Sequence, residues 1–555
     1  MQSDRLKNKY LLVAAILLLL SVYIAATRVY QVDEAENVYS SWLLASGKFG
    51  NYDLYAPIYL FGLQFLTRLS GSAEGMFLSA RLVWVAVFWA ILILIALCVS
   101  ADWKGKRFWR ALTIAGFSAP LWTYGLEVRH DGPALVLLLA IWLVLHPRRA
   151  HQRGGYFLVG SLFALVYFCA AKDIVYAAPL VLLALLIPHP HGSPSASRRW
   201  IQATSGLLSS IALFILLHLS KGTLGQVLKE YQSFLAGVVH TDRFAPWALL
   251  RAVTQQSPFI LVLAILPILT LRKDRVRDHL KNAWSNGVAE LVFIGSIFFG
   301  LLINPTPFPY NALPFTAVVL AVGLPPFLQW LEQQSPRTPG YAIGHGLLVC
   351  TLGVPWTIQI GHLLEMDNDR QVELMNLAER FTSPEDRVFD AAGLVPGRGS
   401  IQPTWYITFG NAPLFLEDPD RQYESLFRAH PPAVLIPTYR FSYLDAGTQA
   451  FLKTHYTPLA GDFWVLGGIY AGAENSWDCI LSGRYWVVVD PQGGSSPMVD
   501  GQPVQAGVRT FSQGAHAVST SPGSHVAIFW LGPNLAAPPH IREGAPGVFP
   551  IPIQM

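Results

Sequence analysis

The sequence predicts a polytopic α-helical membrane protein with about eleven transmembrane helices and a C-terminal domain outside the membrane. Of its 555 residues, 52% are hydrophobic and only 13% are charged, which is typical of a protein with many spans. Apolar stretches recur up to residue 360, and beyond Gly361 the composition becomes that of a soluble domain. Basic residues also gather in every second connection between the stretches.

Eleven apolar stretches are candidate membrane spans. They are Tyr10–Ala26, Met76–Val99, Ala111–Gly125, Pro133–His146, Tyr156–Ala171, Ile174–Pro188, Ile201–Leu219, Pro258–Leu271, Val288–Ile303, Leu313–Trp330 and Tyr341–Ile360. Several are shorter than the roughly 20 residues that cross a bilayer core, so a count of ten or twelve stays open. The first stretch has no clearly separated cleavage site and is interpreted as an uncleaved signal anchor.

Lysine and arginine in the connections predict the orientation of the chain, because such residues concentrate in cytoplasmic loops. The basic segments hold Arg5, Lys7, Lys9; Lys104, Lys106, Arg107, Arg110; Arg148, Arg149, Arg153; Arg198, Arg199; Arg272, Lys273, Arg275, Arg277, Lys281; and Arg337. The other connections are sparser in basic residues. We therefore expect a cytoplasmic N terminus, an extracytoplasmic loop after the first span, and an extracytoplasmic C-terminal domain in a bacterial inner membrane.

The domain boundary is predicted near residue 360, with a transmembrane domain 1–360 and a soluble domain 361–555. Within the soluble part, a helix over Asp369–Phe381 followed by short strands at Arg387–Ala391 and Ala433–Pro437 predicts an α/β region, 361–470. Three further runs separated by turn residues predict a β-sandwich-like region, 471–555; they are Tyr485–Asp490, Val504–Val508 and Val526–Leu531. Asp500-Gly501 is typical of a hairpin turn.

Several functions are disfavoured by the sequence. It contains no basic tail and no nucleic-acid-binding motif, so we expect no nucleic-acid partner. Three of the four cysteines lie in apolar stretches, and no cysteine–histidine spacing indicates zinc. We therefore predict no metal and no cofactor.

The loop Tyr30–Gly71 is the most informative stretch, because it places three acids directly after a membrane span. Asp33 and Glu34 have two interpretations. In one they cap a helix, with Asp33 as N-cap and Glu36 at position N3. In the other a carboxylate at the membrane–water boundary acts as a general base or holds a substrate. Both interpretations are compatible, because a helix start keeps a carboxylate ionised.

Other outside segments carry further charged groups. The turn Glu127–Pro133 contains Arg129, His130 and Asp131, and Lys172-Asp173 follows a later span. The simpler interpretation of Arg129 and Asp131 is an ion pair with each other at the membrane rim, and that of Lys172-Asp173 is an interfacial pair. His240, Asp242 and Arg243 are most simply a solvated loop face. Trp464, Trp477, Trp486 and Trp530 either stack on sugars or belong to a core.

An ordered series of short elements resembles the first loop of the GT-C glycosyltransferases, in particular the bacterial relatives of protein O-mannosyltransferases and aminoarabinose transferases. The series is Asp33-Glu34, Ala45-Ser46-Gly47-Lys48, Asn51-Tyr52-Asp53, Ala56-Pro57-Ile58-Tyr59 and Ala80-Arg81-Leu82. Arg129-His130-Asp131, Lys172-Asp173 and Pro305–Tyr310 also lie where that family has corresponding elements. The resemblance covers about residues 1–360.

The resemblance implies transfer of a sugar from a polyprenyl-phosphate carrier to an envelope acceptor, with inversion. It implies that Asp33 is the general base on the acceptor, and the adjacent Glu34 is the other candidate catalytic residue. Arg129 and Lys172 are the candidate cations for the leaving phosphate, since a fixed charge in a low-dielectric site stabilises developing charge. Asp131 would orient Arg129, hold the acceptor or act as a further acid. Tyr55 and Tyr310 are candidate substrate-binding residues.

One position departs from the family pattern. The aminoarabinose transferases have a lysine immediately before the proline that opens the second helix of the loop, and this chain has Ala56 there. Binding of carrier phosphate would then pass to another residue. Two other classes of function stay open. A transporter or flippase of lipid-linked sugars would show charges at mid-span and related halves, and a non-catalytic subunit would bind glycan through the soluble domain.

Overall fold

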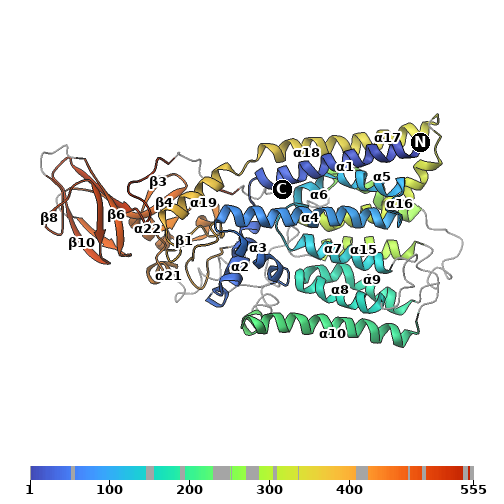
Figure 1. The fold of residues 1–555 in the computed structure, drawn as a ribbon, viewed down its shortest axis with the longest axis horizontal. Coiled ribbons are helices and arrows are strands. Elements are labelled where there is room, and N and C mark those ends of the chain that lie inside the picture. The colour runs from blue at the N-terminus through green and yellow to red at the C-terminus, as the bar shows by residue number, and fades with distance from the viewer. Residues whose placement is uncertain are drawn as a thin grey trace.

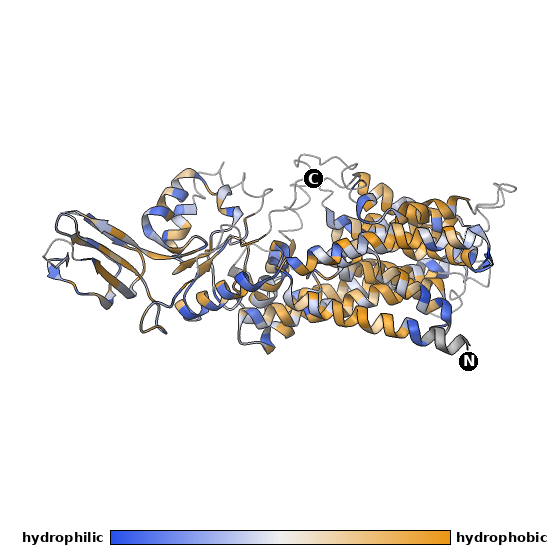
Figure 2. Cartoon of the chain, turned by 90° about the horizontal axis from the view of Figure 1, so that it is seen from above, coloured by the Kyte–Doolittle hydropathy of each residue, from blue (hydrophilic) through white to orange (hydrophobic). Residues whose placement is uncertain are grey.

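The computed structural model consists of a helical bundle at one end and a β-rich domain at the other (Figure 1). It describes residues 2–51, 57–145, 155–187, 194–228, 251, 253–269, 287–303, 309–335, 337–407, 423–472, 475–490, 496–541 and 548–549. The N terminus lies at the end of the bundle away from the β-rich domain. Figure 2 shows apolar residues concentrated over the bundle and mixed colouring over the β-rich domain.

Each of the eleven predicted stretches contains helix. The helices of the bundle are α1 (Gln2–Thr27), α4 (Ala73–Val99), α5 (Lys106–Gly116), α6 (Ala119–Gly125), α7 (Asp131–Leu145), α8 (Gly155–Cys169), α9 (Ile174–Leu186), α10 (Ala196–Ser220), α13 (Phe259–Leu269), α15 (Val288–Ile303), α16 (Ala312–Gln333), α17 (Pro339–Leu348) and α18 (Val354–Glu365). Among the described residues, five helices are long and apolar enough to cross a membrane, and four more are apolar but shorter. The count of eleven spans stays a prediction.

One predicted stretch is not a continuous helix. Ala111–Gly125 is divided between α5 and α6, with a break at Phe117-Ser118. Pro120 explains where the second helix begins, because proline has no backbone N–H and suits the first turn of a helix. The indole of Trp122 donates to the carbonyl of Gly116 at 2.6 Å, which satisfies one of the acceptors freed by the break.

Two glycines bring α8 and α10 into direct backbone contact. A Cβ on Gly160 would lie 1.9 Å from the carbonyl oxygen of Ala203, and one on Gly206 would lie 2.0 Å from that of Phe157. Small residues allow such close approach between membrane helices, where packing rather than the hydrophobic effect drives association. The pairing therefore requires glycine at both positions.

The loop between the first two long helices folds into three short helices, α2 (Val32–Ser46), η1 (Phe49–Asn51) and α3 (Leu60–Leu69). The side chains of Val38, Tyr39 and Leu43 are buried in the same hydrophobic core as Leu374 and Phe381 of the C-terminal domain. A separate core fills the helical bundle. The first of these cores also contains Phe77 of α4 and Phe168 of α8, so helix α2 packs in a core that the outer domain shares with one end of the bundle.

The outer domain begins with α19 (Asp369–Phe381), the predicted helix, which is confirmed. Its other elements are β1 (Val388–Phe389), α21 (Tyr423–Ala429), β2 (Val434–Leu435), η8 (Tyr439–Tyr443), α22 (Ala446–His455), β3 (Tyr456–Ala460), β4 (Phe463–Ala471), β5 (Asn475–Cys479), β6 (Gly483–Asp490), β7 (Met498–Val499), β8 (Gln502–Pro503), β9 (Gly507–Phe511), β10 (Gly514–Ser519) and β11 (His525–Trp530). Strands β1 and β2 pair in parallel, and the remaining pairs are antiparallel.

A seven-stranded sheet in the order β1-β2-β4-β11-β6-β9, with β3 also on β4, runs through the whole domain. The pairing of β4 with β11 joins the regions that were predicted as α/β and β-sandwich-like, so one sheet crosses the expected boundary near residue 470. A four-stranded sheet, β5-β10-β7-β8, packs beside it.

Short-range predictions in the β region meet different outcomes. The hairpin turn is confirmed: Asp500 and Gly501, both at positive φ, join β7 to β8. The strand predicted over Val504–Val508 is wrong in its bounds: residues 504–506 connect β8 to β9, and only Gly507 and Val508 belong to a strand, the start of β9. Trp477 and Trp530 are buried, which places them in the core rather than on a sugar-stacking surface.

Candidate functional site

Helix α2 begins two residues earlier than the capping interpretation expected. Gln31 is the N-cap and Glu34 is N3, so Asp33 lies within the first turn. The backbone N–H of Gln31 donates to Glu34 at 2.8 Å. The expected cap, Asp33 with Glu36 at N3, is therefore wrong by two positions, and the reciprocal contact is made by Glu34.

Glu34 is fully buried and its carboxylate is occupied by protein donors. Arg81 of α4 binds it in a bidentate manner, with Nε 3.0 Å and Nη2 2.7 Å from the two oxygens. The backbone N–H of Val128 donates to it at 3.1 Å. Burial acts to raise the pKa of Glu34, but the adjacent Arg81 holds this pKa below its ordinary value. This environment favours a positioning role, in which Glu34 ties the loop to the membrane domain.

Asp33 has a different environment, because 30% of its side chain is exposed. One carboxylate oxygen forms a short ion pair with Nη1 of Arg129, and the other accepts from the hydroxyl of Tyr406 at 3.1 Å. Burial acts to raise the pKa of Asp33, but Arg129, Arg440 and the Tyr406 hydroxyl together lower it. Asp33 is therefore an ionised carboxylate with access to solvent.

The predicted residues of the later loops converge on Asp33. Arg129 Nε lies 3.2 Å from one oxygen of Asp131, and Lys172 Nζ lies 2.8 Å from the other. Tyr310 lies beneath both cations, with its ring centroid 3.6 Å from Arg129 Cζ and 4.6 Å from Lys172 Nζ. The structure thus brings together Asp33, Arg129, Asp131, Lys172 and Tyr310. Arg129 and Asp131 do form a pair, and Lys172 pairs with Asp131.

Glu36 is a second acid beside Asp33 on α2. Burial and the negative charge of Asp33 raise the pKa of Glu36 to about 7, against opposing contributions from Tyr406, Arg440 and Arg129. Its neighbour Asn37 donates to the carbonyls of Asp33 and Val128, at 2.7 and 3.0 Å, and accepts a short hydrogen bond from Tyr59. Glu36 was recognised in the sequence only as a possible cap partner.

A second buried pair lies behind the site. Arg28, at the end of α1, donates to Glu127 at 2.7 Å and to the carbonyl of Thr123 at 2.9 Å. Burial raises the pKa of Glu127 to about 7, with Arg28 opposing the shift. The turn that carries Arg129 is therefore held to the end of α1 by this ion pair, and to α4 by a hydrogen bond of 3.2 Å from the indole of Trp84 to the carbonyl of Arg129.

Two residues near Asp33 were missed by sequence reasoning, Tyr406 and Arg440 of the outer domain. Arg440 Nη2 donates to the Tyr406 hydroxyl at 2.9 Å, and its Cζ lies 4.0 Å from the centroid of that ring. Tyr406 is separated from Asp33 by 373 residues in sequence. No local pattern connects residues at that separation.

Some predicted positions lie outside the described residues. These are Tyr55, Ala56, His240, Asp242 and Arg243. Within the described residues there is no group of three or more histidine, cysteine, aspartate or glutamate side chains that could hold a metal ion.

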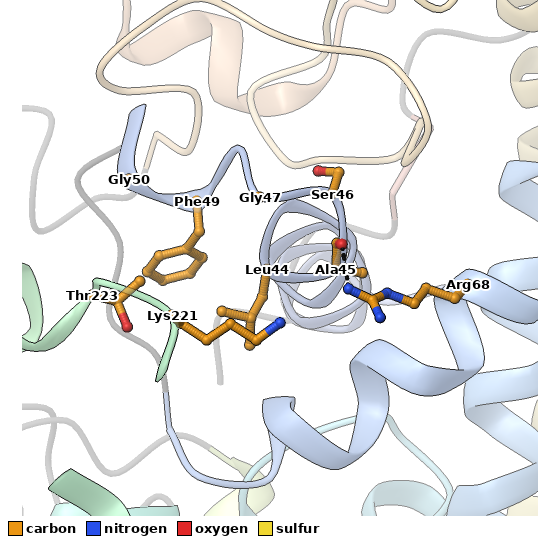
Figure 3. Close-up of a pocket in the computed structure, with 9 residues that line it drawn as sticks. All are labelled: Leu44, Ala45, Ser46, Gly47, Phe49, Gly50, Arg68, Lys221 and Thr223. Atoms are coloured by element: carbon orange, nitrogen blue, oxygen red, sulfur yellow. Dashed lines mark hydrogen bonds between the residues drawn. The ribbon is translucent and has the colours of Figure 1, made fainter. Parts of the chain in front are cut away.

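A separate cavity of about 280 Å³ lies near the other end of α2 (Figure 3). Arg68 and Lys221 are the charged side chains among its lining residues. Arg68 donates to the carbonyl of Ala45 at 2.8 Å, which satisfies an acceptor at the C-terminal end of α2. None of the predicted site residues lines this cavity.

No protein-family model matches the chain, and no curated relative does. Solved structures do match. ArnT from Cupriavidus metallidurans in the apo state has a TM-score of 0.55 at 13% identity, over 83% of this chain and 98% of ArnT. The same protein bound to undecaprenyl phosphate has a TM-score of 0.54 at 13% identity, over 82% and 97%. The apo oligosaccharyltransferase of Archaeoglobus fulgidus has a TM-score of 0.48 at 12% identity, over 80% and 72%.

The likeness to ArnT extends over more than four fifths of this chain, and at 13% identity it concerns the fold. ArnT is an aminoarabinose transferase of the GT-C superfamily. The chain therefore has the GT-C fold, and the fold predicted from the first loop is confirmed.

Proposed function

We propose that this chain, with its GT-C fold, is a membrane glycosyltransferase that moves a sugar from a polyprenyl-phosphate donor to a lipid, polysaccharide or protein of the cell envelope. One observation carries the proposal. A partly exposed carboxylate, Asp33, lies in contact with the buried Arg129, whose partner Asp131 also binds Lys172. ArnT has been crystallised with undecaprenyl phosphate, which supports a lipid phosphate as the carrier.

Asp33 is the general base in this proposal. Each carboxylate oxygen has two lone pairs, so the contacts to Arg129 and Tyr406 leave acceptor capacity for an acceptor hydroxyl. The hydroxyl oxygen forms a bond to the anomeric carbon while the bond from that carbon to the phosphate oxygen breaks. The hydroxyl proton passes to Asp33, and the single displacement inverts the anomeric centre. A positioned base contributes roughly 10²–10⁴-fold to such a step.

Arg129 and Lys172 stabilise the charge that develops on the departing phosphate. Both cations are held by Asp131, whose oxygens lie 3.2 and 2.8 Å from them, so they are positioned before the donor arrives. Tyr310 supports both from one side through its ring face. With Asp33 included, the cluster contains two acids and two cations, and a bound phosphate supplies the additional negative charge that favours both cations.

The proposal also covers the class of the enzyme and its position in the cell. The transferase is of the hexosyl or pentosyl kind, lies in the inner membrane, and acts on the extracytoplasmic face with its N terminus in the cytoplasm. Figure 1 supports this arrangement, because α2 and the outer domain lie at the same end of the bundle, opposite the N terminus. The independence from metal and cofactor stays a prediction.

Replacement of Asp33 by asparagine tests the proposal. Membranes of cells that produce wild-type or Asp33→Asn protein are compared by mass spectrometry of glycolipids, polysaccharide and glycoproteins. We expect the glycan product to disappear in Asp33→Asn while the protein still inserts and purifies normally. Asp369→Asn, an exposed aspartate in the first turn of α19, is the matched control and should keep the product.

The same experiment separates the other classes of function. A non-catalytic glycan-binding subunit would retain its function in Asp33→Asn, because only one proton acceptor is removed. A flippase would change the sidedness of lipid-linked sugars without forming a new glycosidic bond. An unchanged product profile in Asp33→Asn would overturn the transferase proposal.

A further inference from the structure

Tyr406 and Arg440 approach Asp33 from the outer domain, and their contacts form a directed chain. Arg440 Nη2 donates to the Tyr406 hydroxyl at 2.9 Å, and that hydroxyl donates to Asp33 at 3.1 Å. Because Arg440 has no acceptor, the tyrosine oxygen must accept from it and direct its own proton to the carboxylate. The bond from Arg440 therefore has a fixed direction and leaves the hydroxyl proton for the carboxyl groups beside it, Asp33 and also Glu36.

The backbone holds this chain of contacts in place at the ends of two parallel strands. Tyr439 and Arg440 follow β2, and Asp390 and Ala391 follow β1. Because β1 and β2 are parallel, both segments leave the sheet at the end where the carboxyl termini of these strands lie. Residues at that edge are typical of binding sites, since the strands fix where the following loops begin.

Ala391 links the two residues directly. Its carbonyl accepts from Arg440 Nη1 at 3.3 Å and from the backbone N–H of Ile407, next to Tyr406, at 3.2 Å. Ala391 has φ of 61°, a left-handed conformation that is costly for alanine. The carboxylate of Asp390 compensates by accepting from the N–H groups of Ala392 and Leu394, at 2.6 and 2.8 Å. Such conformations persist only where the surroundings enforce them, and they concentrate at functional sites.

We propose that the outer domain completes the active site, with Tyr406 and Arg440 as positioning residues that orient the Asp33 carboxylate toward the acceptor. This inference rests on the proposed function. Arg129 holds one carboxylate oxygen from the membrane domain, and Tyr406 holds the other from the outer domain. A carboxylate held at both oxygens cannot rotate, and its remaining lone pairs keep one direction. Precise placement of this kind is what lowers the entropic barrier of a bimolecular transfer.

The test uses full-length protein in vesicles made from the total lipid extract of its host, with the product followed by mass spectrometry. We expect Tyr406→Phe to lower the rate about 10- to 100-fold, as expected for loss of a hydrogen bond to a charged group. Arg440→Gln should lower it similarly. Tyr443→Phe, on the same short helix η8, is the matched control and should keep the wild-type rate.

The pH dependence of the transfer rate distinguishes a positioning role of Tyr406 and Arg440 from a role in stabilising the fold. Within the part of the chain that the structure describes, the titratable and charged groups that face Asp33 are Arg129, Arg440, Tyr406, Glu36, His130 and Tyr310. Tyr406 and Arg440 both lower the pKa of Asp33, so their removal should move the acid limb of the rate profile to higher pH. The same shift should persist in a Glu36→Gln background. Disappearance of the shift there would show that Tyr406 acts through Glu36 and would overturn the assignment.

Gly532→Ala supplies the structural comparison. Gly532 has φ of +75°, and a Cβ there would lie 2.1 Å from the carbonyl oxygen of Phe381, the last residue of α19. This variant should loosen the packing of the outer domain and lower thermal stability without moving the acid limb. If Gly532→Ala moves the limb as Tyr406→Phe does, the limb reports packing, and the positioning role is wrong.

The outcomes also separate this inference from the proposed function. If Asp33→Asn keeps transfer, the proposed function fails. If Asp33→Asn abolishes transfer while Tyr406→Phe and Arg440→Gln keep wild-type rates and profiles, the inference alone fails.

Discussion

Replacement of Glu34 by glutamine tests whether this residue positions the loop or takes part in the chemistry. Glu34 accepts four hydrogen bonds, from Arg81 Nε and Nη2 and from the N–H groups of Gln31 and Val128. A glutamine presents one oxygen and an NH₂ group, so two of these donors would face another donor. Arg81, only 2% exposed, would also remain as an unpaired buried charge.

The size of the effect follows from that burial. Removing one partner of a buried ion pair costs about 3–5 kcal/mol. In a chain of this size we expect the apparent unfolding temperature of detergent-solubilised Glu34→Gln to fall by several degrees, together with transfer. Asp33→Asn should lose transfer with little change in that temperature.

A double variant provides the control for Glu34→Gln. Glu34→Leu with Arg81→Met removes both charges, and apolar replacement of a whole buried pair is often neutral or stabilising. The double variant should therefore unfold at a higher temperature than either single variant. The reasoning would be refuted if Glu34→Gln were as stable as wild type and yet inactive, because Glu34 would then act in the reaction as the sequence predicted.

Three other predictions follow from the site and the bundle. Arg129→Gln should lower the transfer rate by about 10²–10³-fold, because it removes one donor to the charge that develops on the phosphate. The control is Arg110→Gln: Arg110 lies on α5 and pairs with Glu332, so its replacement should leave the rate unchanged. The pKa of Glu36 is raised to about 7, so the Glu36 side chain becomes negatively charged above that pH. The transfer rate at low donor concentration should therefore fall as the pH rises above this pKa, and Glu36→Gln should abolish this fall. Gly160→Ala should sharply reduce the yield of folded protein in a detergent gel-filtration assay, since its Cβ would lie 1.9 Å from Ala203 O, while Gly295→Ala, with no atom within 4 Å, should not.

Features of the chain that depend on neighbouring residues were predictable from the sequence. The apolar stretches, the helix over Asp369–Phe381 and the turn at Asp500-Gly501 are all determined by local composition. The order of short elements in the first loop also indicated the GT-C fold. The break at Phe117-Ser118 was missed because both halves of the stretch are apolar, and hydrophobicity does not distinguish one helix from two.

Features that depend on distant contacts were not predictable. Glu34 and Asp33 are adjacent in sequence, yet one is fully buried against Arg81 and the other reaches solvent. Their difference depends on α4 and on the outer domain. The same holds for Tyr406 and Arg440, since neither belongs to a local motif and both reach Asp33 only through the fold of the sheet.

The packing of α2 against the outer domain has a consequence for biosynthesis. The loop with Asp33 emerges from the ribosome early, but Tyr406 follows 373 residues later. At about 5–20 residues per second, the loop waits roughly 20–75 seconds for its partner. During that interval Val38, Tyr39 and Leu43 have no outer-domain core to pack in. The side chains of α2 therefore acquire their contacts with the outer domain only after most of the chain has been made.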